Sequence, residues 1–151
     1  MKTCRTARLL ALALLFSTTA AQAEDGAAGL LKIEITGLKD VTGSVYVAVY
    51  DSESRWLGEE TVTSREVDIA GALQGEVVTT ELQLPLGSYA FSIFYDANGN
   101  GELDTNFIGM PKEPIALSNN AKARFGPPKY EDAAFALDLE PMTQRVIMTL
   151  L

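Results

Sequence analysis

Hydrophobic residues alternate with polar ones over most of the chain, and a period of two predicts β-strands. The clearest alternation spans 31–36, where leucine and isoleucine are separated by Lys32, Glu34 and Thr36. Similar patterns mark 43–50, 77–84, 89–95, 135–139 and 146–150, with weaker ones at 62–69 and 115–117. No stretch keeps a long helical period, although short helical turns are expected at 52–57 and 130–133. About seven short strands separated by turn residues predict an all-β fold, a single antiparallel β-sandwich.

The stretch from residue 96 to residue 129 departs from this alternation. It is rich in Asn, Gly and Pro, and its strand pattern is limited to Ile115 and Leu117. A connection of this length in a compact domain is usually functional or disordered. Because it also contains Phe107, Ile108 and Met110, we expect it to pack and to form one long ordered loop.

The first 23 residues predict a secretory signal peptide. Three basic residues precede a compact apolar run over 9–16, and an A-x-A cleavage pattern ends at Ala23. The apolar run is shorter than a membrane-spanning helix, which argues against a retained anchor. We therefore expect segment 1–23 to be removed near Ala23. The remaining domain, 24–151, is expected to lack a transmembrane segment and to be periplasmic or secreted.

Composition limits the chemistry of the remaining domain. The single cysteine, Cys4, precedes the apolar run, so residues 24–151 have no disulfide and no thiol, and the chain has no histidine. Without histidine, a Ser-His-Asp hydrolase is excluded and zinc, copper or iron sites are disfavoured. Nine basic and twenty acidic residues remain after position 23, a net charge of −11. Such a surface repels nucleic acid and anionic lipid but suits cations, metal ions or basic peptides.

Segment 96–104 places oxygen-bearing side chains at alternate positions, as calcium-binding loops do. Asp96, Asn98 and Asn100 match the first, third and fifth ligand positions of an EF-hand loop. Gly101 matches the glycine of its sharp turn, and Leu103 is expected to anchor the loop to the core. The candidate metal ligands are Asp96, Asn98, Asn100, Glu102 through its carbonyl, Asp104 and, from downstream, Glu113.

The match to an EF-hand loop is incomplete. The twelfth position, which should be a bidentate glutamate, is Phe107, and no helical pattern flanks the loop. An ion therefore needs another carboxylate, and Glu113 is the nearest downstream one, although it could instead pair with Lys112 or Arg124. With few charged ligands, calcium is expected to bind weakly, at about 10⁻⁴ to 10⁻³ M. A polar turn in which Asp and Asn accept backbone N–H bonds remains equally open.

The same carboxylates define an alternative function, a carboxylate-dependent hydrolase of the cell envelope. Two carboxyl groups held close together can separate their pKa values and act as acid and base. Asp96, Glu102, Asp104 and Glu113 are the candidates, with Lys112 as an electrostatic aid. No nucleophile with an adjacent base is visible, so we expect no enzyme and name no catalytic residue. The favoured function is an exported binding or structural module for an unknown protein or carbohydrate of the envelope, with Ca²⁺ as its one candidate cofactor.

Two further surfaces have a functional and a structural interpretation. Trp56, Tyr46 and Tyr50 could form an aromatic platform for a sugar or peptide, although a lone Trp at the end of a strand more often packs against the core. Asn119 and Asn120 could form a polar binding edge with Lys122 and Arg124, although a solvated turn is favoured.

Seven segments of the sequence together form a recognisable combination of motifs. They are 43–50, 84–90, 96–106, 108–113, 118–120, 125–128 and 131–135. In this combination the chain resembles a bacterial exported family called domain of unknown function 2141, over nearly all of residues 24–151. The resemblance implies an immunoglobulin-like or transthyretin-like β-sandwich. It implies no activity, because none is assigned to the family. Segment 114–117 departs from the family pattern, which has a glycine there.

Overall fold

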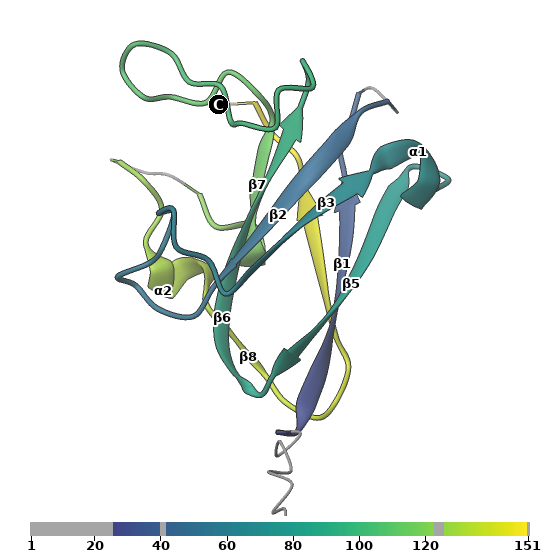
Figure 1. The fold of residues 1–151 in the computed structure, drawn as a ribbon, viewed down its shortest axis with the longest axis vertical. Helices are drawn as coiled ribbons and strands as arrows, with labels where there is room; N and C mark the ends of the chain where they lie inside the picture. The colour runs from purple at the N-terminus through teal and green to yellow at the C-terminus, as the bar shows by residue number, and fades with distance from the viewer. Residues whose placement is uncertain (1–25, 40–41, 123–125, 151) are drawn as a thin grey trace, which may run out of the picture.

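Two sheets pack face to face in the computed structural model, which describes residues 26–39, 42–122 and 126–150 (Figure 1). One sheet has the strand order β4-β5-β1-β9. The other has the order β3-β2-β6-β7, with β8 added against β6. The predicted all-β sandwich is confirmed, with nine strands in the described part of the chain. The predicted signal peptide and Cys4 lie outside the described residues.

The strand boundaries follow the alternating pattern of the sequence closely. The strands are β1 (Ala28–Thr36), β2 (Ser44–Tyr50), β3 (Thr63–Asp68), β4 (Leu73–Gln74), β5 (Val77–Pro85), β6 (Gly87–Asp96), β7 (Ile115–Leu117), β8 (Phe135–Leu137) and β9 (Met142–Ile147). The helices are α1 (Ile69–Ala72) and α2 (Tyr130–Ala133), with a 3-10 turn η1 (Ser118–Asn120). In the part of the chain that the structure describes, no helix is long and apolar enough to cross a membrane.

The two predicted helical turns have different outcomes. The turn at 130–133 is confirmed as α2. The stretch 52–57 forms hydrogen-bonded turns, with N–H of Arg55 donating to the carbonyl of Ser52, and not a helix. The sequence does not predict helix α1, because the alternation over 62–69 indicates a strand to its end, whereas the helix begins at Ile69. Asp68 begins this helix by accepting the N–H of Gly71 at 2.7 Å.

The core lies between the sheets and is built by the strand alternation. Leu31, Ile33 and Ile35 of β1 are fully buried, while the polar residues between them face outward. β2 lies between β3 and β6 in the other sheet. Burying each such aliphatic side chain stabilises the fold by roughly 1.5–3 kcal/mol. The strands therefore form a stable frame for the loops at their ends.

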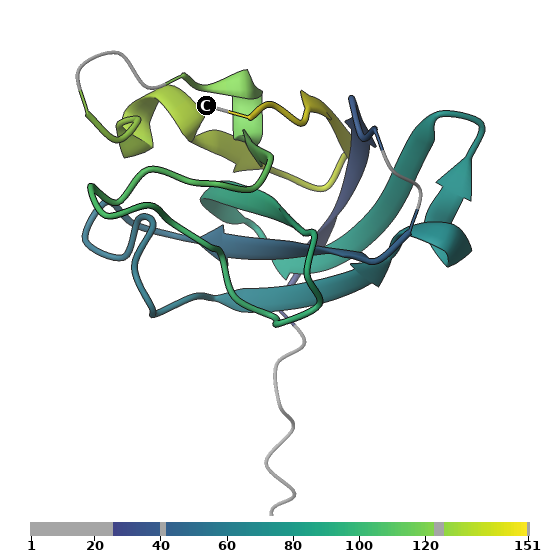
Figure 2. The same cartoon turned by 90° about the horizontal axis from the view of Figure 1, so that it is seen from above.

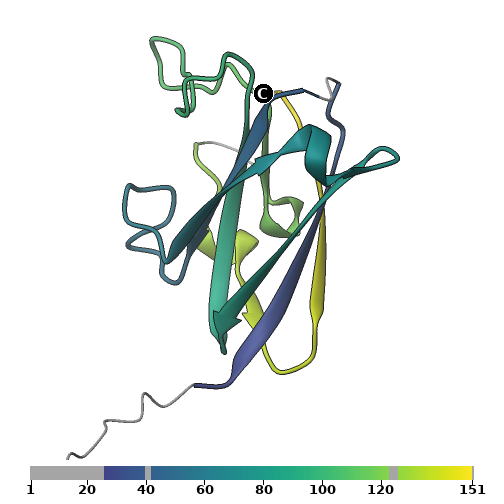
Figure 3. The ribbon, with the colours of Figure 1, turned by 45° about the vertical axis from the view of Figure 1, so that its right-hand side comes forward.

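One strand pair departs from the antiparallel arrangement. β9 runs parallel to β1, from the Leu31–Met142 pair to the Thr36–Ile147 pair. Figure 3 shows β9 in yellow beside β1 in purple. The chain reaches this position after β8, which pairs with the other sheet, so it crosses from one sheet to the other before β9 begins.

The edge of β9 that faces away from β1 is joined to the second sheet. Ile115 and Thr149 exchange backbone hydrogen bonds of 2.9 Å in both directions. The Asn120 side chain donates to the carbonyl of Arg145 at 2.8 Å and accepts the N–H of Ile147 at 2.9 Å. One side-chain amide thus supplies the two bonds that a neighbouring strand would make. Asn119 and Asn120 are exposed, as expected of a turn, but they also hold β9 in place.

Candidate functional site

The loop that connects β6 to β7 begins at a buried carboxylate. Figures 1 and 2 show this loop extending from one end of the sandwich, away from α1. Asp96 ends β6, and its carboxylate accepts the N–H groups of Gly99 at 2.7 Å, Asn100 at 3.2 Å and Gly101 at 2.8 Å. Gly99 and Gly101 have φ values of 74° and 76°, which glycine adopts without a steric cost. The predicted turn glycine at position 101 therefore has the required conformation.

The two asparagines of the loop continue the same chemistry. Asn98 Oδ1 accepts the N–H of Asn100 at 3.0 Å, and Asn100 Oδ1 accepts the N–H of Glu102 at 2.9 Å. Asn98 Nδ2 donates to Asp104 at 2.6 Å, and Asn100 Nδ2 lies 3.5 Å from the other carboxylate oxygen of Asp104. These bonds are the Asx-turn pattern that the polar-turn interpretation predicts. Glu102, whose carbonyl was a candidate ligand, is exposed.

Glu113 joins the two ends of the loop, although it follows Asp96 by many residues in sequence. It is 4% exposed. Its Oε1 accepts the N–H of Ala97 at 2.8 Å, and its Oε2 accepts the N–H of Asp104 at 3.0 Å. The structure thus brings Glu113 to the loop, and its role as a metal ligand stays a prediction. Lys112 contributes a backbone N–H to the carbonyl of Asp104 at 2.8 Å, and Arg124 lies outside the described residues.

Backbone hydrogen bonds control the charge of Asp96. Burial alone would raise the pKa of its carboxyl, but the N–H groups of Gly101, Gly99, Asn100 and Asn98 together outweigh that effect and hold the pKa below its ordinary value. A group with a lowered pKa in the folded state stabilises the fold at neutral pH and loses this contribution as the pH falls through the folded pKa. Asp96 therefore stays ionised at neutral pH. An ionised carboxylate can accept hydrogen bonds or bind a cation, but it has no proton to donate as a general acid.

The carboxylates of the loop retain some capacity for a cation. A carboxylate offers about four acceptor sites, of which Asp96 uses three and Glu113 uses two in these hydrogen bonds. No group of three or more Asp, Glu, His or Cys side chains within the described ranges is arranged to hold a metal ion. A calcium ion here would thus depend on amide and carbonyl oxygens as well as carboxylates. Such a ligand set fits weak binding.

The outer part of the loop exposes three apolar side chains. Asn106 Oδ1 accepts the N–H groups of Ile108 and Met110, both at 3.0 Å, and the N–H of Asn106 donates to the carbonyl of Met110 at 2.8 Å. Phe107 is 99% exposed, Ile108 68% and Met110 41%. We call Phe107, Ile108 and Met110 the apolar tip. The expectation that these residues pack is wrong, and so is the anchoring of Leu103 in the core, because Leu103 is also exposed. Hydrogen bonds, rather than apolar packing, order this loop.

Trp56 packs within the domain and does not form a platform with Tyr46. Its Nε1 donates to the carbonyl of Pro128 at 2.7 Å, and its ring meets Tyr50 and Tyr130 edge-on, at 5.3 and 6.0 Å between ring centres. Trp56 thereby ties the turn after β2 to the segment before α2. Tyr46 stacks on Phe94 instead, with ring centres 5.0 Å apart.

Ser118 is a structural residue that the sequence did not single out. It is fully buried, its Oγ accepts the N–H of Phe91 at 3.0 Å, and its hydroxyl donates to the carbonyl of Ala133 at 2.7 Å. One hydroxyl therefore connects β6, η1 and α2. Nothing local in the sequence distinguishes this serine from the exposed serines of the chain, because its partners are distant in sequence.

Comparison with known proteins gives one match. A family model described as an uncharacterized protein conserved in bacteria, domain of unknown function 2141, matches residues 33–145. No curated protein and no solved structure matches the chain. The matched range includes the whole Asp96–Glu113 loop and Ser118.

Proposed function

The chain belongs to the bacterial family domain of unknown function 2141, and we propose that it is an exported binding or structural module whose contact surface is the apolar tip. The observation that supports this most strongly is the nearly complete exposure of Phe107 on a hydrogen-bonded loop. Exposed apolar groups gathered in one place mark interaction sites in soluble proteins. A loop already ordered before binding loses little conformational entropy on binding, which favours affinity. The partner is a protein or carbohydrate of the envelope.

Photo-crosslinking from the apolar tip tests this function. Replacing Phe107 by the photoreactive residue benzoylphenylalanine keeps an aromatic group at the site. Irradiation of envelope extracts is expected to give one discrete adduct from position 107. The matched control carries the same group at Leu139, which is also exposed but lies in the turn between β8 and β9. Met110→Ser should reduce the adduct from position 107. No discrete adduct, or the same adducts from both positions, would contradict the proposal.

We also propose that the same loop binds Ca²⁺ weakly. No three carboxylates of the described residues are arranged around one ion, so Asp104 supplies charge together with only one of Asp96 and Glu113. The Asn98 and Asn100 side-chain oxygens and the Glu102 carbonyl complete the ligand set. An ion that binds only the folded state stabilises it by mass action. Because Glu113 and Asp96 already hold the loop through backbone N–H groups, calcium is expected to tighten this loop and not to create it.

Thermal unfolding of residues 24–151 tests calcium binding. In calcium at about ten to one hundred times the dissociation constant, the free energy of unfolding should rise by about 1.4–2.7 kcal/mol relative to EDTA, and magnesium should have a smaller effect. Asp104→Asn should remove the calcium-specific rise with little effect in EDTA, because the Asp104 carboxylate accepts only the side-chain amides of Asn98 and Asn100 among the described bonds. Glu140→Gln, an exposed acid elsewhere, is the control and should keep the rise. Equal melting temperatures in EDTA, calcium and magnesium would rule out the ion site.

A further inference from the structure

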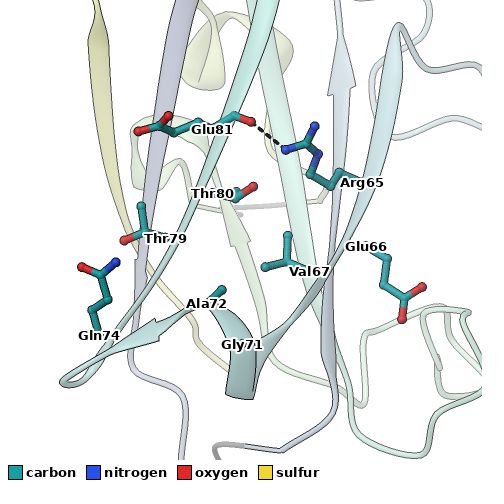
Figure 4. A pocket seen from close by; sticks show the side chains of 9 residues that line it. All are labelled: Arg65, Glu66, Val67, Gly71, Ala72, Gln74, Thr79, Thr80 and Glu81. Carbon is teal, nitrogen blue, oxygen red and sulfur yellow. Dashed lines mark hydrogen bonds between the residues drawn. The ribbon is translucent and has the colours of Figure 1, made fainter.

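The two sheets meet along two seams, of which one is closed and one is open. The seam between β7 and β9 is closed by the Ile115–Thr149 hydrogen bonds and by the Asn120 side chain. The opposite seam lies between β3 and β5. Among the described residues a single hydrogen bond joins these two strands, from Arg65 Nη1 to the carbonyl of Glu81, at 2.8 Å. Figure 4 shows this bond crossing the opening.

A groove of about 690 Å³ occupies the open seam. Arg65 and Val67 of β3 line one wall, and residues 79–81 of β5 line the other. In Figure 4, α1 closes one end, and the Arg65–Glu81 bond spans the other end. Thr80 is the one polar residue among the inward-facing positions of β5, and it lies on the groove wall. The lining of the groove is therefore mostly polar, with Val67 and Ala72 as its apolar side chains.

β5 has an open hydrogen-bonding edge along this groove. β4 is only two residues long and pairs with β5 at Val77 and Val78. From Thr79 to Pro85, the described residues place no second strand on this side of β5. Backbone groups of successive residues in an antiparallel strand point to opposite sides. Because the Glu81 carbonyl points into the groove, the backbone groups of Thr79 and Gln83 face the same way. An unpaired edge of this kind is a template for an added strand.

We propose that the groove accepts an extended segment of a protein partner, which adds as a strand to β5 in line with β4. The Arg65 guanidinium leaves the Glu81 carbonyl, and the incoming backbone takes its place. This site is separate from the β6–β7 loop that carries the apolar tip, because that loop extends away from α1, which closes the groove (Figures 1 and 2). Strand addition gives affinity through main-chain hydrogen bonds, while alternate side chains give specificity.

The charges beside the groove indicate the chemistry of the segment. Glu81 lies opposite Lys32 on β1, but Lys32 forms an ion pair of 3.0 Å with Glu34. Glu66 borders the groove from β3, but its carboxylate accepts the Ser44 hydroxyl at 2.8 Å and its side chain points away from Glu81 in Figure 4, so Glu81 is the acid that an added strand meets. Opposite charges on neighbouring strands stabilise the pairing, and like charges oppose it. The segment that fits therefore carries Lys or Arg on its outer face, beside Glu81, and small or β-branched residues on the face toward Val67.

Arg65 has a second interpretation, as a charged residue that only protects the strand edge from aggregation. The two interpretations differ in what an extended peptide does. If Arg65 only protects the edge, its removal should expose a strand edge that binds basic and acidic peptides equally. If the groove is a binding site, a basic alternating peptide should bind it selectively, and removing Arg65 should strengthen this binding.

NMR titration of residues 24–151 with synthetic peptides tests the proposal. The probe is Thr-Lys-Val-Lys-Val-Lys-Thr, and the matched control replaces each Lys by Glu. The lysine peptide should shift the amide signals of Thr79, Glu81 and Gln83. It should bind Arg65→Ser about three to ten times more tightly than the wild type, because no side chain must be displaced. The glutamate peptide should bind neither protein.

Three variants make the result decisive. Gln83→Pro removes an N–H group from the open edge and should abolish binding, since edge strands tolerate proline but lose the bond. Glu81→Lys should weaken the binding of the lysine peptide about three- to tenfold, whereas Glu140→Lys, remote from the groove, should not. No amide shift in wild type and Arg65→Ser at millimolar lysine peptide would overturn the proposal. Equal binding of both peptides, or binding that Gln83→Pro and Glu81→Lys leave unchanged, would also overturn it.

Discussion

Ser118→Ala is expected to lower the free energy of unfolding by about 2–3 kcal/mol, because it leaves a buried N–H and a buried carbonyl without a partner. The N–H of Phe91 and the carbonyl of Ala133 both bond the serine hydroxyl, and neither residue is exposed. Such a loss is a large part of the stability of a small domain, which is roughly 5–15 kcal/mol. Urea unfolding followed by circular dichroism measures it.

Ser64→Ala is the matched control for this prediction. Ser64 lies on β3 and is exposed, so its replacement should change the free energy of unfolding by less than about 0.5 kcal/mol. If both variants unfold at the same urea concentration as the wild type, Ser118 does not connect β6 to α2 as the structure indicates.

Glu113→Ala should give the second large loss of stability, and this loss should be centred on the loop. Its carboxylate is the acceptor for the N–H groups of Ala97 and Asp104, which it holds at 2.8 and 3.0 Å. Removing an acceptor for two partly buried donors costs about 2–3 kcal/mol, and a segment of low local stability can open without global unfolding. Glu113→Gln keeps one acceptor oxygen, so this variant should lose less stability than Glu113→Ala. Thermal unfolding of both variants measures the global part of this cost.

Glu131→Ala is the control for the Glu113 variants, because it removes an exposed carboxylate from α2. Its melting temperature should match that of the wild type. A Glu113→Ala protein that melts at the wild-type temperature, with its loop amides as protected as before, would show that Glu113 does not order the loop.

The frame of the fold was predictable because it depends on local alternation. The buried positions of β1 and β2 follow directly from residues that alternate in the sequence, so neighbouring residues suffice to place them. The parallel pairing of β1 with β9 was not predictable in this way. It depends on which strands meet across the domain, and the alternation of a single strand does not contain that information.

The candidate loop was predictable in its residues but not in its bonding. Alternating oxygens after a strand predict a tight loop at Asp96, and Glu113 is the nearest downstream carboxylate. The sequence did not show that Glu113 bonds two backbone N–H groups. The apolar content of the loop predicts that Phe107 packs, which is wrong. Asn106 orders the tip by hydrogen bonds and leaves Phe107 exposed.

The open seam between β3 and β5 is a property of the fold that no sequence pattern predicts. Arg65 and Glu81 are ordinary charged residues at exposed strand positions. They gain a shared role only because the two sheets place them on opposite sides of one groove.

Amide hydrogen exchange of the loop, followed residue by residue by NMR, tests the central claim most directly. That claim is that hydrogen bonds hold the loop ordered so that it presents the apolar tip. In the wild type, the amides of Ala97, Gly101 and Asp104 should be protected, because each donates to a carboxylate. In Glu113→Ala, Ala97 and Asp104 should exchange about thirtyfold faster, which corresponds to about 2 kcal/mol. Unprotected amides at all three positions in the wild type would contradict the account, because the tip would then sit on a loop without fixed structure.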